Sequence, residues 1–232
     1  DPIMVPATLE TGHLPDFAGL PEDVLNRTTA AYICSPANPQ GVVATREYWA
    51  ELIALAEKYD FKVFADECYS EIYRDRPPVG AIQVAKEVGA DPDRIVIFHS
   101  LSKRSNLPGL RSGFVASGTN SIREVRQLRN YAGAPLPLPL QQAAAAVWND
   151  ETHVVENRRL YVEKYDIADR ILGNVPGYAS PDAGFFLWLP VSDDETAALK
   201  LWRETGVRVL PGGYLAQDVA GKNPGKGYIR AA

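Results

Sequence analysis

The chain has 232 residues, of which 46% are hydrophobic and 23% charged, and its formal net charge is −5. This composition is ordinary for a soluble globular protein, and the length suits one large domain or slightly more. The acidic balance provides no footprint for nucleic acid, and no apolar run approaches the ~20 residues that span a bilayer, so we expect neither a nucleic-acid nor a membrane partner.

The first part of the chain alternates between short apolar runs and helix-like stretches. The proline-bounded segment 1–6 predicts a short strand, and residues 21–25 predict a helical turn. Thr45 is a typical N-cap, and it precedes a helix to about residue 60 with apolar side chains at helical spacing. The other predicted elements are strands at 30–34, 61–65, 94–98 and 114–117, of which the first and third are expected to be buried, and helices at 81–88 and 121–131.

The second part is richer in helix. Helices are predicted at 141–150, 151–172 and 194–205, and strands at 184–189, 207–210 and 228–231. We therefore expect a large domain over residues 1–150, and over residues 151–232 a linking helix with a smaller α+β domain. Cys34 and Cys68 lie in apolar, strand-like stretches, which favours reduced thiols and fits a cytoplasmic protein.

Strand–helix alternation over the first 150 residues predicts an α/β fold with a mostly parallel sheet and helices on both faces. In such sheets, ligands bind beyond the carboxyl ends of the strands. Asn38, Asp66, Ser100 and Lys103 all follow a predicted strand, so we expect them at one edge of the sheet.

The loop between the strands at 94–98 and 114–117 carries a hydroxyl, a lysine and an arginine: Ser100, Lys103 and Arg111. Arginine grips phosphate with paired hydrogen bonds, and a desolvated lysine can serve as a nucleophile. A lone lysine in a turn is more often a solvated surface residue. The loop alone therefore leaves both interpretations open.

Further motifs favour the first interpretation. They are Asn38-Pro-Gln-Gly41, Asp66-Glu-Cys-Tyr69, Ser100-Leu-Ser-Lys103 followed by Arg111, and Gly227-Tyr-Ile-Arg230. In this order and spacing, the chain resembles the fold-type I pyridoxal-phosphate aminotransferases of class I/II, and the resemblance extends over nearly its whole length. Family members are longer, so we expect a fragment that lacks an N-terminal segment and a C-terminal tail, and poor activity if the protein is no longer than this.

The resemblance implies pyridoxal 5′-phosphate as cofactor. Lys103 would hold it as a Schiff base and then move the substrate's proton, while Asp66 would pair with the pyridine nitrogen. Tyr69 and Asn38 would hydrogen-bond the phenolic oxygen of the ring.

The same resemblance implies sites for two anionic groups. Ser100 and Arg111 would bind the phosphate of the cofactor, with Ser102 as a possible helper. Arg230 would bind the α-carboxylate of the substrate beside Asn38, as a fork that lysine cannot replace.

The motifs are closest to those of the bacterial N-succinyldiaminopimelate aminotransferases, which implies a homodimer that exchanges an amino group with 2-oxoglutarate. The distal acids of such a substrate need further cations, and the candidates are Arg74, Arg104 and Arg208. Two alternatives stay open: a carbon–sulfur lyase with the same cofactor, and the sensing domain of a transcription regulator. The three histidines are scattered, so we expect no metal site, and Glu67 and Glu71 are expected to be rim residues.

Overall fold

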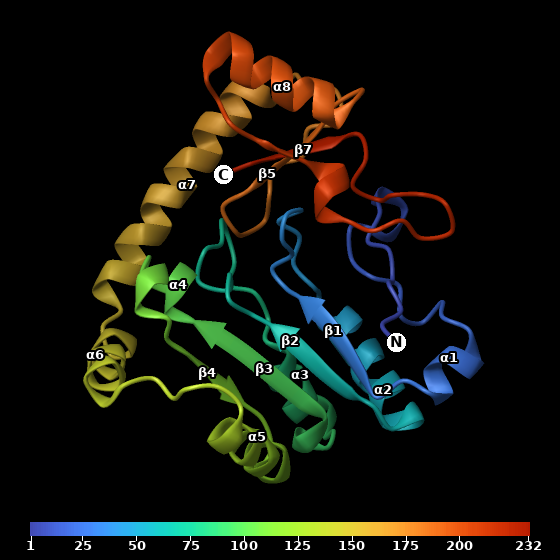
Figure 1. The fold of residues 1–232 in the computed structure, drawn as a ribbon, viewed down its shortest axis with the longest axis vertical. Coiled ribbons are helices and arrows are strands. Elements are labelled where there is room, and N and C mark those ends of the chain that lie inside the picture. Colours follow the sequence, from blue (N-terminus) through green and yellow to red (C-terminus); the bar gives the residue numbers. More distant parts are fainter.

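The computed structural model describes residues 1–232 (Figure 1). Its strands are β1 (Ala30–Cys34), β2 (Lys62–Asp66), β3 (Ile95–Ser100), β4 (Gly113–Ala116), β5 (Leu187–Pro190), β6 (Leu210–Pro211) and β7 (Tyr228–Ala231). Its α-helices are α1 (Glu22–Asn26), α2 (Arg46–Tyr59), α3 (Ala81–Val88), α4 (Leu101–Arg104), α5 (Thr119–Tyr131), α6 (Leu138–Trp148), α7 (Thr152–Leu172) and α8 (Asp194–Thr205). Short 3-10 helices lie at Leu9–Thr11, Pro92–Arg94, Pro108–Leu110 and Gly212–Leu215.

The larger sheet has four strands in the order β1-β2-β3-β4. The first three are parallel, and β4 runs antiparallel to β3, with Ser100 opposite Gly113. The mostly parallel sheet predicted from the alternating pattern is therefore confirmed. Because β1, β2 and β3 are parallel neighbours, their carboxyl ends lie at the same edge of the sheet, which Figure 1 shows below the smaller sheet.

Helices α2 and α3 cover one face of this sheet, and the main hydrophobic core lies between these two helices and the sheet. The Thr45 hydroxyl accepts a hydrogen bond from the amide of Tyr48 at 3.2 Å, which caps α2 as predicted. Trp49 on α2 is fully buried, and truncating such a side chain to alanine costs about 3–5 kcal/mol. On the opposite face, Tyr32 of the edge strand β1 is 72% exposed.

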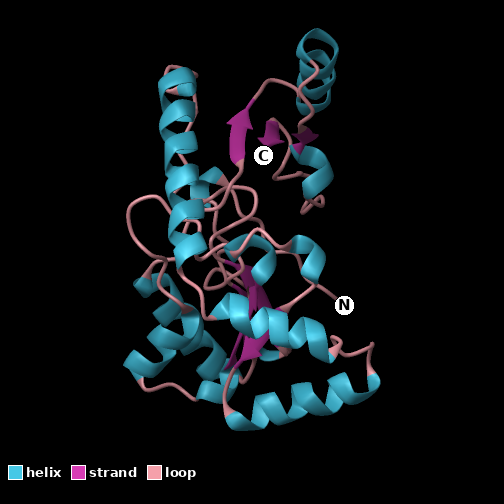
Figure 2. Ribbon diagram, turned by 90° about the vertical axis from the view of Figure 1, so that its left-hand side faces the viewer, coloured by secondary structure: helices cyan, strands magenta, loops and turns pink.

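The smaller sheet has the order β5-β7-β6, and all of its pairs are antiparallel. Helix α7 runs from α6, beside the larger sheet, up to the smaller one, and α8 lies above the smaller sheet (Figures 1 and 2). None of the helices combines the length and apolar character needed to cross a bilayer.

Two sequence predictions of secondary structure are wrong. Residues 1–6 form no strand, because their proline-bounded run pairs with neither sheet. The strand expected at 207–210 is reduced to Leu210–Pro211, since only that pair reaches β7. The helices predicted at 81–88 and 194–205 and the strand predicted at 228–231 are confirmed at those bounds.

Candidate active site

The candidate site begins where β1, β2 and β3 end. Cys34 pairs in register with Asp66, and Asp66 pairs with Phe98, so the three side chains share one face of the sheet. That face is the one opposite α2 and α3, since the alternate residues Val63 and Ala65 are buried in the core. The carboxylate of Asp66 is exposed there, and it accepts a hydrogen bond from the amide of Cys68 at 3.0 Å.

Lys103 is held over the same region by α4, which follows β3 directly. The Ser100 hydroxyl caps α4 by accepting a hydrogen bond from the Ser102 amide at 3.0 Å. The Lys103 Nζ atom lies 4.7 Å from the ring centroid of Phe185 and 5.8 Å from that of Tyr69. The ammonium group therefore rests against two aromatic rings, and no carboxylate lies within ion-pair distance.

Lys103 and Asp66 both act on the thiol of Cys68. Burial raises the pKa of this thiol, Asp66 raises it further, and the Lys103 ammonium opposes the change. The amine and the acid are therefore neighbours of the same half-buried side chain. That both groups face one ligand stays a prediction.

Asn38 connects the larger sheet to the smaller one. Its Nδ2 donates a hydrogen bond to the Tyr69 hydroxyl at 3.2 Å, and its Oδ1 accepts one from Arg230 at 3.2 Å. The guanidinium carbon of Arg230 also lies 4.5 Å from the ring centroid of Phe186. The fold thus brings together residues as far apart in sequence as Asn38 and Arg230.

The residues predicted to bind phosphate lie around the start of α4. The Ser100 hydroxyl donates a hydrogen bond to the Ser102 hydroxyl at 2.9 Å. Leu101 donates its amide to the carbonyl of Ser112 at 3.1 Å, which places the backbone next to Arg111 against α4. The Arg111 side chain bonds within its own loop, to the Pro108 carbonyl at 2.7 Å, and forms no hydrogen bond with Ser100 or Ser102.

Lys103, Arg111 and Arg230 share one property: none of them pairs with a carboxylate. The other arginines near the site are neutralised, as Arg74 binds Asp166 and Asp169. Unpaired cations around the edge of a sheet favour an anionic ligand, because burying that charge beneath a ligand requires a counterion. The residues present therefore fit a phosphorylated cofactor and a carboxylate substrate.

Two of the arginines proposed for the distal acids of the substrate are already occupied. Arg74 is bound by two carboxylates of α7, and Arg104 binds Glu151. Arg208 has no carboxylate partner and lies 5.6 Å from the ring centroid of Trp202. The charges of Arg74 and Arg104 thus serve contacts within the chain, and Arg208 is the candidate left without a carboxylate partner.

Two residues beside the site differ from the sequence interpretation. Glu67, expected at the rim, is 5% exposed, and its carboxylate binds the Ala81 amide at 2.8 Å and His99 at 3.2 Å. Phe185 was not predicted at all, although it follows Gly184 in an aromatic pair. No local signal identifies it, since its role comes from contact with Lys103 across the chain.

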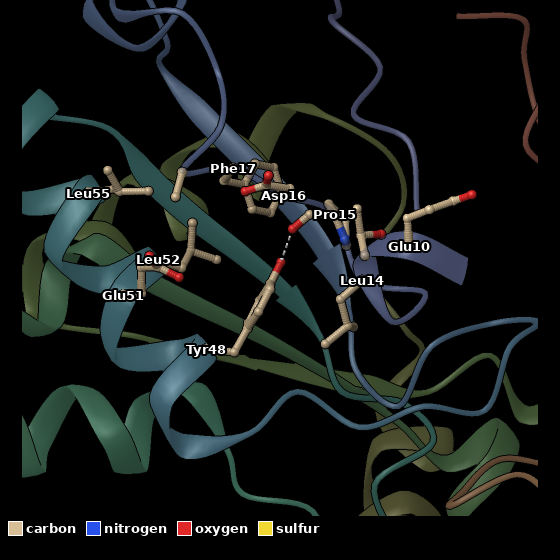
Figure 3. Close-up of a pocket in the computed structure, with 11 residues that line it drawn as sticks. Glu10, Leu14, Pro15, Asp16, Phe17, Tyr48, Glu51, Leu52 and Leu55 are labelled. Atoms are coloured by element: carbon tan, nitrogen blue, oxygen red, sulfur yellow. Dashed lines mark hydrogen bonds between the residues drawn. The ribbon is translucent and has the colours of Figure 1, made fainter. Parts of the chain in front are cut away.

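A separate pocket of about 240 Å³ lies between residues 10–18 and α2 (Figure 3). The Tyr48 hydroxyl donates a hydrogen bond across it to the Pro15 carbonyl at 2.6 Å. Three carboxylates line it, from Glu10, Asp16 and Glu51. This charge disfavours a phosphate, and the pocket shares no residue with the site at the strand ends.

Comparison with known proteins agrees with this geometry. The chain is 33% identical to the LL-diaminopimelate aminotransferase of Dehalococcoides mccartyi, over 97% of this chain and 57% of that protein. An aminotransferase structure from Neisseria meningitidis superposes with a TM-score of 0.90 at 44% identity, over 95% of this chain and 57% of the other. A probable N-succinyldiaminopimelate aminotransferase from Thermus thermophilus superposes with a TM-score of 0.80 at 27% identity, over 95% and 58%.

These structures confirm the predicted fold class, that of the pyridoxal-phosphate transferases. The chain spans a little over half the length of the relatives that it matches. The sequence profile described as aminotransferase class I and II matches residues 2–230. This match covers nearly the whole chain, and the chain belongs to the class I and II aminotransferase family, whose members depend on pyridoxal 5′-phosphate.

Proposed function

We propose that this protein is a pyridoxal-phosphate-dependent aminotransferase that moves an amino group between an amino acid and a 2-oxo acid. The observation that carries the proposal is the grouping of Lys103, Asp66 and Arg230 at the edge between the two sheets, with both cations free of carboxylate partners. A transaminase needs an amine, an acid and a carboxylate receptor around one ligand.

When bound, pyridoxal phosphate supplies an electron sink for the negative charge that develops on the substrate's α carbon. Lys103 would attach to it through Nζ and, once released, move a proton at the α carbon of the substrate. The carboxylate of Asp66 would keep a proton on the nitrogen of the ring. Tyr69 and Asn38 would orient the ring through hydrogen bonds to its oxygen.

The remaining residues would hold the two anionic groups. Ser100 and Ser102 offer hydroxyl donors for the phosphate, and Arg111 would turn from the Pro108 carbonyl to add a charged fork. Arg230, kept in place by the Asn38 amide and the Phe186 ring, would bind the substrate's α-carboxylate. The exposed carboxylate of Asp66 lies at the strand end, with one oxygen free of any hydrogen bond.

Covalent trapping tests the proposal at Lys103. Borohydride reduction in the presence of pyridoxal phosphate is expected to label the peptide that contains Lys103, and Lys103→Ala is expected to abolish that label. Lys164→Ala, which removes an exposed lysine on α7, serves as the matched control and is expected to leave the label intact. Equal labelling of Lys103→Ala and the native chain refutes the role.

Steady-state kinetics tests Arg230. Arg230→Lys keeps the charge but loses the fork, so the KM for the amino acid is expected to rise by about tenfold or more. An unchanged KM contradicts the assignment. Measuring the 2-oxo acid formed against the ammonia released in the same assay separates transamination from elimination by a carbon–sulfur lyase.

We further propose that the amino donor is a diaminopimelate compound, N-succinyl-LL-diaminopimelate or LL-diaminopimelate itself, and that 2-oxoglutarate is the acceptor. Support comes from the relatives, which include LL-diaminopimelate aminotransferases and a probable N-succinyldiaminopimelate aminotransferase. A panel of donors decides it: turnover of aromatic and aspartate donors with none of the diaminopimelate compounds rejects this narrower claim.

The organisation of the whole protein is proposed on the same basis. Residues 1–150 would form the cofactor-binding domain, and residues 151–232 the linking helix and a smaller domain that closes the site with Arg230. We also propose a homodimer in the cytoplasm, where the free thiols of Cys34 and Cys68 are stable. Sedimentation of the purified protein tests the dimer.

A further inference from the structure

Arg104, directly after Lys103, is an unusually buried cation. It is 5% exposed, although it ends a helix of only four residues. Such a short helix has almost no stability of its own, because forming the first turn costs more than its hydrogen bonds return. The position of Lys103 therefore depends on what anchors the residues on either side of it.

The guanidinium of Arg104 contacts the junction between α6 and α7. It donates hydrogen bonds to the carbonyls of Val147 at 3.1 Å and Trp148 at 3.3 Å, the last two residues of α6. It also forms an ion pair with Glu151, just before α7, and its carbon lies 4.9 Å from the ring centroid of Trp148. One side chain thus joins three segments.

Helix α7 is attached to the other side of the site as well. Arg158 on α7 binds the Glu71 carboxylate at 2.6 Å, two residues after Tyr69. Tyr161, also on α7, stacks on Phe185 with ring centroids 5.9 Å apart. The helix to which Arg104 is tied therefore also supports the rings against which the Lys103 ammonium rests.

We propose that Arg104 is a positioning residue: by tying α4 to the α6–α7 junction, it holds the Lys103 amine at the correct place for attack on the cofactor's carbonyl carbon. The role rests on the proposed function of Lys103. Leu101, which is fully buried, anchors the start of α4, and Arg104 anchors its end. Without the second anchor, the amine would sample positions that do not lead to reaction.

The test uses the chain with pyridoxal phosphate alone and follows borohydride trapping at Lys103 by peptide mass spectrometry. Arg104→Met keeps much of the side-chain volume and loses every hydrogen bond. It is expected to lower the maximal trapping rate by about ten- to a hundredfold, since a misplacement near 1 Å has that effect. The cofactor concentration for half-maximal trapping is expected to stay unchanged, because the proposed phosphate contacts of Ser100 and Ser102 lie at the start of α4, which Leu101 anchors.

Two further variants keep the test decisive. Glu151→Gln removes the ion pair at a side chain that is 66% exposed, so the chain is expected to fold and to show a smaller decrease in the trapping rate. Arg104→Lys keeps the charge but cannot span two carbonyls and the carboxylate, and it is expected to recover the rate in part. Arg170→Met, at an exposed position of α7, is the matched control and is expected to match the native rate.

Native trapping rates in both Arg104→Met and Glu151→Gln overturn the proposal. The proposal is also overturned if the cofactor concentration for half-maximal trapping rises while the maximal trapping rate falls, because that combination indicates general damage to the fold. If Arg104→Met does not fold, Glu151→Gln decides alone by the same criteria. Failure of the native chain to trap the cofactor at Lys103 instead refutes the proposed function, which separates the two claims.

Discussion

At the scale of single residues, Glu67 shows how a buried carboxylate can organise the edge of a sheet. It accepts the first amide of α3, from Ala81, and pairs with His99 at the end of β3. The His99 ring in turn stacks on Phe114 of β4, with centroids 5.0 Å apart. Glu67 therefore links the strand that carries Asp66 to the strand that carries Ser100.

Truncating Glu67 is expected to destabilise the fold. In Glu67→Ala, the buried Ala81 amide loses its acceptor and His99 loses its carboxylate neighbour. An unsatisfied buried amide costs about 1–3 kcal/mol. Urea unfolding measures the loss. Glu204→Ala, at an exposed position of α8, is expected to change the unfolding free energy little, and equal losses in the two variants contradict the assignment.

Tyr69 has an unusual ionisation for a residue that faces a ligand site. Burial is the main cause that raises the pKa of Tyr69 to about 12. Cys34 and Asp66 raise this pKa further, and the Arg230 guanidinium lowers it. The neutral phenol is favoured in the folded chain, so its contribution to stability is complete below the ordinary tyrosine pKa and is lost as the pH rises toward about 12.

Titrating the ultraviolet absorbance of tyrosinate tests this. Subtracting the curve of Tyr69→Phe from that of the native chain is expected to isolate a transition well above the ordinary tyrosine range. Throughout neutral pH, Tyr69 is therefore expected to remain able to donate its proton in a hydrogen bond. A difference curve centred at the ordinary pKa of tyrosine contradicts the predicted burial effect.

At the scale of elements, the loop Asn38-Pro-Gln-Gly41 is held against the segment before β5. The Gly41 carbonyl accepts hydrogen bonds from the amides of Asp182 and Ala183, each at 3.0 Å. Gly41 has a φ of +74°, and a Cβ atom there would lie 2.4 Å from the Cβ of Pro181. The glycine of this motif is therefore required by a close approach of two segments, and that approach fixes Asn38 beside Tyr69.

Gly41→Ala is expected to be strongly destabilising, since the left-handed backbone alone costs about 1–2 kcal/mol and the clash with Pro181 adds to it. Gly89→Ala is the matched control, because Gly89 has a φ of +72° with nothing within 4 Å of its Cβ position. The free energies of unfolding of the two variants in urea separate the effects, because Gly89→Ala has only the backbone strain and Gly41→Ala also has the clash with Pro181. Equal destabilisation of the two variants shows that the contact with Pro181 carries no energy.

At the scale of the whole molecule, α7 connects the two sheets, as Figures 1 and 2 show. Arg74, after the Asp66–Tyr69 motif, binds Asp166 and Asp169 on α7 and also the Ser180 hydroxyl. The Tyr165 hydroxyl of α7 donates to the Gly184 carbonyl. These contacts hold the segment that carries Phe185 and Phe186 against the large sheet.

Removing the contacts of Arg74 with α7 and Ser180, here called the Arg74 clamp, is expected to weaken the packing of the segment before β5 against the large sheet. Arg74→Met is expected to lower the unfolding free energy by about 1–2 kcal/mol, since a partly exposed charged network contributes less than a buried one. Hydrogen exchange of the bonded amides of Asp182, Ala183 and Gly184 is expected to accelerate. Arg76→Met, at an exposed position two residues away, is the control, and equal exchange in the two variants contradicts the clamp.

The sequence by itself determined the strands of the large sheet, the capped helix α2 and the positions of Asn38, Asp66 and Lys103 just beyond the strand ends. Hydrophobic period, capping and strand-end polar residues are local signals, and each is readable within a few residues. The strands predicted at 1–6 and 207–210 were wrong for the same reason. Their local pattern is strand-like, but the presence of a partner strand beside them is not a local property.

The tertiary structure alone decided how the remaining charges are used. It paired Arg74 and Arg104 with carboxylates, left Arg230 unpaired beside Asn38, buried Glu67 and placed Phe185 against Lys103. Each of these depends on contacts between residues far apart in the chain. The sequence shows that a cation is present, and only the fold shows whether a partner has already neutralised it.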